Sequence, residues 1–329
     1  MSKIEKDEQT KDTPKDKYRV TNWKAYNKAL ENRGNLTFYF DEATLKDWYS
    51  QGPNQRGAQQ IYSDTCIEAI MSFKTIFRLA YRQVRGFTVG LLSLVGFGEL
   101  QVPSFSQINR RFLAMELAPL VIKVDGPVII AIDSTGVKVY GEGEWKCRKH
   151  GYSKRRTWRK LHLGVDVETG MIHCHTTTEN SAGDESQLEP LLEQLEEQQT
   201  PVEDVCLDGA YDNFGNYESL LERNITPVIP PRKDAVPWYA ERPGDMDQHP
   251  RNVAIERIDE VGRKAWKQEA LYHRRGLSET AMFRFKTIFG AVHYSRRLAS
   301  QTQENKLKIK LLNRMTALGM PCSEKVIAA

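Results

Sequence analysis

The sequence contains little cysteine and no long apolar run. Five cysteines are scattered through 329 residues without a CxxC pair, which argues against a disulfide framework and favours a reducing compartment. No stretch reaches 18 apolar residues, so a transmembrane helix is not expected. The first residues lack the apolar core of a signal peptide. These absences predict a soluble cytoplasmic protein with no membrane partner.

The charged residues are nearly balanced in number but unevenly distributed. Lys and Arg total 47 against 43 Asp and Glu, so the formal net charge is only +4. Residues 145–165, however, contain eight basic residues, no acidic residue and the interleaved aromatics Trp145, Tyr152 and Trp158. Basic side chains bind phosphates, and aromatic rings stack on unpaired or distorted bases. This segment therefore predicts DNA phosphate contacts, the alternative being a solvated surface loop. The predicted contacts are Lys154, Arg155, Arg156, Arg159 and Lys160.

The first hundred residues read as a charged tail followed by helices. Residues 1–20 combine Lys, Asp, Glu and Thr with almost no apolar content, which predicts a disordered tail. Ser63 has the position of an N-cap for a first helix, and a second helix is expected from Thr88 to the region of Gly96. These features predict a helical domain over residues 21–120.

A third helix is expected to begin after Ser104. Gln107 follows three residues later, which is the spacing of a capping box. The helix carries polar and basic residues between apolar ones, as in the last helix of a helix-turn-helix that reads DNA. A small bundle that only packs on the next domain is the alternative. The residues predicted to read DNA are Gln107, Asn109, Arg110 and Arg111.

From Pro127 the pattern changes to strands. VIIAID is a short β-branched apolar run, GVKVY follows after a tight turn, and two strands surround Gly170. Next come an amphipathic helix over about 184–199, a strand in VEDVCLD, a helix over 213–223, a strand in ITPVIP, and helices to about residue 318. A ribonuclease-H-like core, a mixed sheet flanked by helices, requires this order. We predict such an α/β core over residues 121–320, with a tail over 321–329.

Three acidic residues occupy the positions at which such a core carries its carboxylates. Asp133 ends the first strand, Asp208 ends the fourth, and Glu279 lies on a later helix. Two Mg²⁺ ions about 3.5–4 Å apart can activate water and stabilise the leaving group in phosphodiester hydrolysis, and Mg²⁺ prefers carboxylate oxygens. The first aspartate would bridge both ions. The structural alternatives are Asx turns for the two aspartates and complementation of a helix dipole for the glutamate.

A polar pattern surrounds the third carboxylate. Tyr272, Arg275, Glu279 and Lys286 would share an arc of about 60° on an ideal α-helix. A packing stripe would be apolar, whereas a phenol, a guanidinium, a carboxylate and an ammonium suit a phosphodiester beside a metal ion. Because Ser278 can serve as an N-cap, the alternative is that the helix begins there and the first two side chains lie on the preceding turn.

Two other clusters carry less information. His173, Cys174 and His175, with Cys147 and His150, invite a zinc interpretation, but their spacing matches no standard zinc pattern. We interpret the two outer histidines as side chains on one face of a strand. A second basic cluster reads as ordinary helix surface and consists of Arg296, Arg297, Lys306, Lys308 and Lys310.

Several stretches resemble the DDE transposases of bacterial insertion sequences, in particular the group with a Tyr-x2-Arg-x3-Glu-x6-Lys signature. The matching stretches include NWKAYNKAL, FSQINRRF, IDSTGVKVYGEGEWKC, LDGAYD and YHRRGLSETAMFRFK, and they extend from about residue 22 to about residue 320. The signature is complete in YHRRGLSETAMFRFK.

The resemblance implies a role for each matched position. Two Mg²⁺ ions, with Mn²⁺ as a substitute, would be bound by Asp133, Asp208 and Glu279. DNA phosphates at the end of the element would be contacted by Tyr272, Arg275 and Lys286. Water would first free a 3′-OH, which would then attack target DNA without a covalent protein–DNA intermediate. The expected partners are inverted-repeat ends and target DNA, bound by a homodimer in the bacterial cytoplasm at the nucleoid.

Two other functions stay open on the sequence alone. A catalytically silent DNA-binding repressor derived from a transposase would bind DNA indifferently to metal and to Glu279→Gln. A general ribonuclease-H-like nuclease would cleave its substrate without terminal repeats. The intact carboxylates argue against the repressor, and the helical N-terminal domain and the signature argue against the general nuclease.

Overall fold

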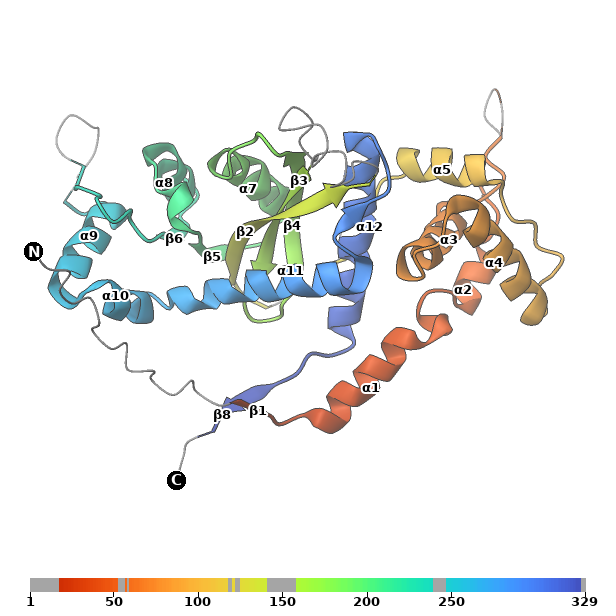
Figure 1. Ribbon diagram of the computed structural model, residues 1–329, viewed down its shortest axis with the longest axis horizontal. Helices are drawn as coiled ribbons and strands as arrows, with labels where there is room; N and C mark the ends of the chain where they lie inside the picture. The colour runs from red at the N-terminus through yellow and green to blue at the C-terminus, as the bar shows by residue number, and fades with distance from the viewer. Residues whose placement is uncertain are drawn as a thin grey trace, which may run out of the picture.

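A mixed sheet lies at the centre of the molecule, with helices on its faces and a group of N-terminal helices at one end (Figure 1). This architecture confirms the predicted α/β fold class. No helix among the described residues is long and apolar enough to cross a membrane. The computed structural model describes residues 18–52, 57, 59–117, 120–121, 125–140, 158–238 and 247–326.

The central sheet has the strand order β4-β3-β2-β5-β6, and β7 pairs with the far end of β2. The β2–β3 and β3–β4 pairs are antiparallel, whereas β5 and β7 run parallel to β2 and β6 runs parallel to β5. β2 is therefore the strand on which the sheet is built. The strands are β2 Val128–Val139, β3 Trp158–Asp166, β4 Ile172–Glu179, β5 Val202–Cys206, β6 Thr226–Val228 and β7 Val292–His293.

β2 is one continuous strand, which corrects the predicted turn between VIIAID and GVKVY. Its pairing with β3 runs through this region, with Ser134 opposite His162 and Lys138 opposite Trp158. A Cβ atom on Gly136 would stand 3.1 Å from the ring of Trp158. The glycine thus makes room for a cross-strand indole, and β3 supplies the backbone partners that a turn would have lacked.

Side chains of β2 alternate between two helical layers, as the period of a strand requires. Ile130 and Ile132 share a core cluster with α7 and α8, whereas Val137 belongs to the cluster that contains α11 and α12. Asp133 lies four residues before Val137, so its side chain points to the same face of β2, the face on which α11 packs. The predicted helices over 184–199 and 213–223 are confirmed by α7 and α8. The bounds are α7 Leu188–Glu197, α8 Phe214–Leu221, α11 Gly276–Phe289 and α12 Leu298–Ala317.

Of the three helix starts predicted in the N-terminal region, those after Ser63 and Ser104 are confirmed. Ser63 Oγ accepts from Cys66 N at 3.0 Å at the start of α3, and Ser104 and Gln107 form the predicted capping box at the start of α5. The prediction for α4 is wrong at its start. The bounds are α1 Trp23–Gly34, α2 Glu42–Lys46, α3 Asp64–Ile76, α4 Tyr81–Leu94 and α5 Phe105–Ala114.

α4 begins seven residues before the predicted position at Thr88. Its first turn is closed by Gln83, whose Oε1 accepts from Ala80 N at 2.9 Å. Ala80 itself has no polar side chain, so the usual N-cap signal is missing from the sequence. Thr88 is buried in the middle of the helix, and its hydroxyl donates a hydrogen bond to Val84 O at 2.9 Å.

The N-terminal helices and the sheet share one hydrophobic core, which includes residues of α3, α5, α11, α12 and β3. Polar contacts join the same elements. Gln303 on α12 donates to the carbonyls of Phe112 and Met115 at 2.9 and 2.8 Å, and Lys310 pairs with Glu68 at 2.8 Å. The division near residue 120 stays a prediction, but these contacts fix the helices against the core.

The two ends of the described chain form a small sheet, which includes the last three residues of the predicted N-terminal tail and part of the predicted C-terminal tail. β1 (Tyr18–Val20) pairs antiparallel with β8 (Ser323–Lys325), below the main body in Figure 1. Asn22 strengthens the junction, because its side chain donates to Met320 O and accepts from Cys322 N. The pairing joins segments about 300 residues apart, and no local pattern announces it. Residues 1–17 and 327–329 lie outside the described residues.

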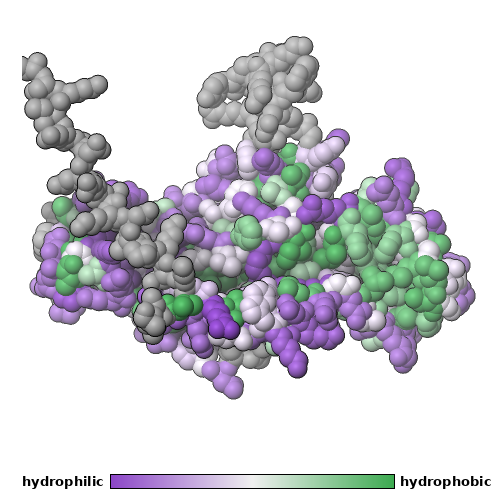
Figure 2. Space-filling model, turned by 60° about the horizontal axis from the view of Figure 1, so that its bottom comes forward, coloured by the Kyte–Doolittle hydropathy of each residue, from purple (hydrophilic) through white to green (hydrophobic). Residues whose placement is uncertain are grey.

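The surface of the N-terminal helices is more apolar than the opposite end of the molecule. Figure 2 shows apolar surface gathered at its right-hand end, where α3 and α4 lie, and hydrophilic surface at the left-hand end. Exposed apolar residues of the helical end include Phe77, Val89, Leu94 and Val95. The left-hand end contains α9 (Pro250–Val261) and α10 (Arg263–Glu269).

Candidate active site

Asp133, within β2, and Asp208, just after β5, lie at the strand edge where the pairing of these two parallel strands ends. The last register pair between β2 and β5 is Ala131 with Cys206, and each aspartate lies two residues beyond it. The strand geometry therefore brings the two carboxylates together on one side of the sheet. Their charges interact, since Asp208 contributes to the raised pKa of Asp133.

Asp133 is a partly buried carboxylate, with 18% of its side chain exposed. Burial raises its pKa above the ordinary value, and the repulsion from Asp208 adds to this effect. The shift is opposed by a hydrogen bond from Ser134 N to Oδ1 at 2.8 Å and by the charge of Arg275. Such a group gains from any cation brought beside it.

Arg275 connects this strand edge to Glu279. Its Nη1 donates to Asp133 Oδ2 at 2.6 Å, and its Nη2 donates to Glu279 Oε1 at 2.8 Å. Glu279 lies in the first turn of α11, which packs against β2 and β3. One guanidinium therefore stands between the carboxylate of the first strand and that of the helix.

The four signature side chains lie on two helical segments. Tyr272 and Arg275 belong to the 3₁₀ helix η4 (Tyr272–Arg275), and α11 begins at Gly276. Ser278 is not the N-cap, because its Oγ donates to Arg275 O at 2.7 Å from within the first turn. The alternative in which Tyr272 and Arg275 lie on the turn before the helix is thus correct, but the helix begins at Gly276 and not at Ser278. Glu279 and Lys286 share one face of α11, being seven residues apart.

Tyr272 and Lys286 are half-buried groups on the two helical segments that carry Arg275 and Glu279. The ring of Tyr272 lies 5.9 Å from the guanidinium carbon of Arg275 and 4.9 Å from Lys267 Nζ. Burial raises the pKa of Tyr272, so its hydroxyl remains a donor at neutral pH. Burial also lowers the pKa of Lys286. The contacts of both residues with DNA stay predictions.

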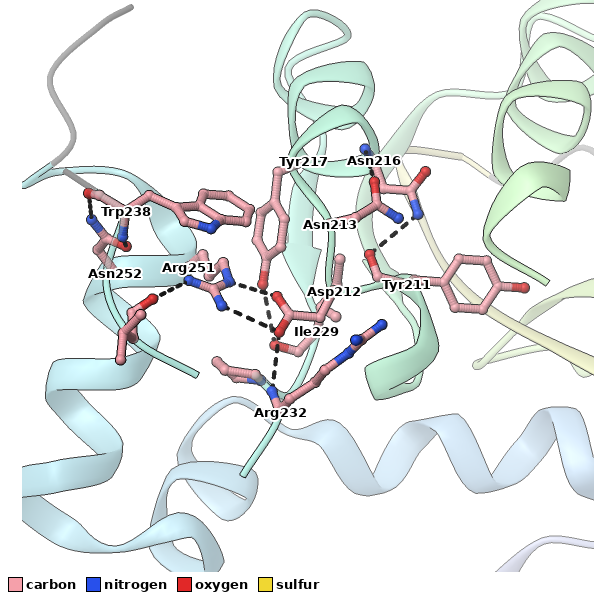
Figure 3. A network of polar contacts seen from close by, with 12 residues as sticks. Tyr211, Asp212, Asn213, Asn216, Tyr217, Ile229, Arg232, Trp238, Arg251 and Asn252 are labelled. Carbon is pink, nitrogen blue, oxygen red and sulfur yellow. Dashed lines mark hydrogen bonds and ion pairs between the residues drawn. The ribbon is translucent and has the colours of Figure 1, made fainter. Parts of the chain in front are cut away.

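The segment after Asp208 is fixed by a buried ion pair that the sequence does not reveal. Asp208 Oδ1 accepts from Ala210 N at 2.8 Å and caps the 3₁₀ turn Gly209–Tyr211. Immediately beyond it, Asp212 Oδ1 accepts from Arg251 Nε at 2.7 Å, and both side chains are more than nine-tenths buried. Figure 3 shows this pair at the centre of a polar network.

Further contacts hold the arginine of this pair in place. Arg251 donates from Nη1 to Val236 O at 2.7 Å, and its guanidinium lies 4.1 Å from the ring of Trp238 (Figure 3). Arg232 N donates to Asp212 Oδ2 at 3.0 Å. The network ties α9 and the loop before it to the turn that carries Asp208. Because the partners are 39 residues apart, the LDGAYD motif alone gives no signal for it.

The donor set of the site fits a hard divalent cation. Asp133, Asp208 and Glu279 offer the carboxylate oxygens that Mg²⁺ prefers, and burial together with the charge of Asp208 raises the pKa of Asp133. In the part of the chain that the structure describes, however, no three His, Cys, Asp or Glu residues stand close enough to hold one ion together. Arg275 occupies the position between two of the carboxylates, so a shared ion requires the guanidinium to move.

The predicted phosphate contacts of the basic run fall into two groups. Lys154, Arg155 and Arg156 lie outside the described residues. On β3, Arg159 Nε donates to Gln301 Oε1 at 2.7 Å, and Lys160 Nζ donates to Ala182 O at 2.7 Å. These two side chains therefore connect parts of the fold, and their contact with DNA stays a prediction.

The four predicted DNA-reading residues of α5 are not equally available. Gln107 is engaged in the capping box. Arg111 donates to Tyr62 O at 2.8 Å and pairs with Asp64 at 2.5 Å, which fixes α5 against the start of α3. Asn109 and Arg110 are exposed. The role of this helix in reading DNA stays a prediction, with the exposed pair as its best-placed members.

The histidine cluster lies within the sheet. His173, Cys174 and His175 are buried on β4, and the two histidines share a face, as interpreted from the sequence. Cys147 and His150 lie outside the described residues, and no metal-binding group occurs among those that are described.

Comparison with known families gives two matches. A family model described as a transposase DDE domain matches residues 125–314, which is more than half of the chain. A second model with the same description matches residues 31–142. The first match contains the strand edge, the helix and all three carboxylates described above.

Proposed function

This chain belongs to the transposases with a DDE domain, and on that premise we propose that it cuts DNA at the inverted-repeat ends of its own element and joins the freed ends to target DNA. The observation that carries the proposal is the placement of Asp133 and Asp208 at one strand edge, with Glu279 joined to Asp133 through Arg275. The family supports a divalent metal requirement and DNA as the partner.

The proposed reaction has two displacements at phosphorus. In the first, the oxygen of water bonds to phosphorus while the P–O3′ bond breaks, which leaves a 3′-OH on the element and a 5′-phosphate on the flanking DNA. In the second, that 3′ oxygen bonds to a target phosphorus and releases a target 3′-OH. Two bound Mg²⁺ ions would lower the pKa of water and neutralise the leaving oxygen. Neither step forms a protein–DNA bond.

Each side chain of the site has a task in this proposal. Asp133, Asp208 and Glu279 would hold the metal ions through their carboxylate oxygens. Arg275 would leave the carboxylates and donate to a non-bridging phosphate oxygen, for which its planar donors are suited. Tyr272 and Lys286 would add donors on either side. The Asp212–Arg251 pair would fix the turn that carries Asp208 without touching DNA.

The experiment uses the DNA that flanks the gene for this protein, end-labelled and incubated with the full chain and Mg²⁺ or Mn²⁺. Asp133→Asn, a nearly isosteric change, is compared with Asp204→Asn on β5 as the matched control. We expect metal-dependent cleavage at a repeat end that Asp133→Asn abolishes and the control retains.

The other outcomes identify the rival functions. Specific binding without cleavage, in the natural protein as well as in Asp133→Asn, would identify a repressor. Cleavage without preference for an end would identify a general nuclease. Cleavage that survives Asp133→Asn would refute the assignment of the catalytic carboxylates.

A further inference from the structure

A cavity of about 360 Å³ lies away from the carboxylates, where the N-terminal helices meet the core. It is enclosed by the turn between α3 and α4, the last residue of α11, the segment after β7, and α12. Its lining includes Lys74, Arg78, Tyr81, Tyr294, Glu304 and Lys308. Because Glu279 and Phe289 lie ten residues apart on α11, the cavity is about 15 Å along the helix from the carboxylate.

Lys308 is a buried cation without a hydrogen-bonding partner. The residue is only 6% exposed, and among the described residues its ammonium makes no hydrogen bond or ion pair. Its recorded contact is with the ring of Phe285, whose centroid is 5.7 Å from Nζ. Burial lowers its pKa. An ammonium in this position costs free energy unless a counter-charge accompanies it.

Two further cations line the same cavity. Lys74 Nζ lies 4.8 Å from the ring centroid of Tyr81 and, within the described chain, has no ion pair either. Arg78 Nη2 donates to the carbonyls of Thr287 and Ile288 at 3.3 and 3.2 Å, which holds the guanidinium at the cavity wall at the end of α11. The positive charge therefore comes from both the helical unit and the core.

The carboxylate in the lining is already engaged. Glu304 accepts from Ser295 Oγ at 2.5 Å and faces His293 Nδ1 at 3.3 Å. Burial alone would raise the pKa of Glu304. The hydrogen bond with His293 and the charge of Lys308 outweigh burial and lower this pKa to about 2. One ionised carboxylate thus faces three cations, which leaves an excess of two positive charges in a partly enclosed space.

We propose that this cavity binds a phosphate group between the ammonium groups of Lys308 and Lys74, with Arg78 at its wall. Lysine is a common phosphate ligand that acts as a point charge, and an oxyanion would supply the counter-charge that these residues lack. The phosphate can belong to the DNA backbone or to a free ion, since both present the same oxygens. A bound phosphate would draw the α3–α4 turn and α12 together.

The first test is thermal unfolding of the full chain in millimolar inorganic phosphate against chloride at equal ionic strength. We expect a saturable rise in Tm of about 2–4 °C. Lys308→Met should abolish the rise, and the Tm of the variant in chloride is the baseline for that comparison. Lys306→Met, on the same helix and outside the cavity lining, should keep the rise. If Lys308→Met does not fold, Lys74→Met takes its place.

A second measurement distinguishes the two sources of the phosphate. The affinity for a short duplex of random sequence is followed against salt by fluorescence anisotropy. If the phosphate belongs to DNA, Lys308→Met reduces the slope of log K against log salt by about one. If it is a free ion, the slope is unchanged while the rise in Tm is lost.

A missing or non-saturable rise in the natural protein, or a rise that Lys308→Met preserves, overturns the proposal. Neither readout requires DNA cleavage, so the phosphate site and the transposase activity can fail separately.

Discussion

Arg275 Nη1 lies 2.6 Å from Asp133 Oδ2, and this contact joins residues 142 positions apart in the chain. The same guanidinium reaches Glu279 with its other terminal nitrogen. In the protein without DNA, the arginine thus supplies positive charge to carboxylates that we propose as metal ligands. Metal ions and the guanidinium would compete for the carboxylates until a phosphodiester offers the arginine new acceptors.

We predict that Arg275→Gln lowers the rate of DNA cleavage by about 10²-fold, the scale of removing one charge-stabilising donor from an active site. Arg275→Lys should recover only part of the rate, because an ammonium cannot make the two-armed contact. Single-turnover cleavage of end-labelled DNA measures both. Arg274→Gln is the matched control and should stay near the natural rate. Equal rates for Arg275→Gln and the control would remove Arg275 from the site.

We predict that Asp133→Asn abolishes cleavage and yet does not destabilise the protein at neutral pH. Burial raises the folded-state pKa of Asp133 above its ordinary value of 3.8. A carboxyl with a raised pKa contributes stability that is present below pH 3.8 and lost as pH rises through the folded pKa. Asparagine does not ionise, so Asp133→Asn removes this loss of stability.

Urea unfolding of the natural protein and of Asp133→Asn, at pH 7 and near pH 3.8, measures the difference in stability. Asp133→Asn should be at least as stable as the natural protein at pH 7, and any gain in stability should disappear near pH 3.8. A variant that is much less stable at pH 7 would show that the Asp133 charge stabilises the fold.

Local patterns predicted those elements whose causes are local. The β-branched run VIIAID became the centre of the sheet, and Ser63 and Ser104 cap the helices that follow them. Asp133 and Asp208 come together because each lies two residues beyond the last register pair of the parallel strands β2 and β5, although β2 itself continues to Val139. Glu279 followed from its signature spacing in the sequence.

Two of the features that the sequence did not predict depend on partners far along the chain, and a third depends on an unusual local contact. Arg251 is buried because Asp212 meets it across the fold. Lys308 was interpreted as helix surface, yet its side chain is buried and lines a cavity between α12 and α3. The start of α4 was missed because Ala80 gives no capping signal. In the first two cases the deciding contact involves a residue far along the chain, whereas the start of α4 is closed locally by Gln83.

We predict that Arg251→Met destabilises the fold by about 3–5 kcal/mol, because it leaves Asp212 as an uncompensated buried charge. Cleavage should fall as well, since the turn that carries Asp208 loses its anchor. Denaturant unfolding gives the loss of stability. Arg257→Met serves as the control, because Arg257 pairs with Glu260 and Glu269 on exposed surface, where ion pairs contribute little.

The double variant Arg251→Met with Asp212→Asn should regain part of the loss, because both charges are then absent. If Arg251→Met and the double variant are both as stable as the natural protein, the ion pair does not hold the turn.

We predict that the protein loses stability as the pH falls from about 6.5 toward 4. Burial lowers the pKa of His162 and of His175 from 6.5 to about 4. Although Asp184 lies 3.8 Å from the His162 ring, burial dominates, and the ring is neutral in the folded protein at pH 7. A lowered folded-state pKa contributes stability that is full above pH 6.5 and lost as pH falls through about 4, because only the unfolded chain takes up the proton.

His162→Gln isolates this contribution, since an amide can keep the hydrogen bond to Thr178 Oγ1 that the ring makes at 3.0 Å. The urea midpoint should therefore depend less on pH between 7 and 4.5 in this variant than in the natural protein. His273→Gln changes an exposed histidine and should leave the pH dependence as it is. If His162→Gln and His273→Gln reduce the pH dependence equally, burial of the His162 ring is not the cause of the loss of stability at acid pH.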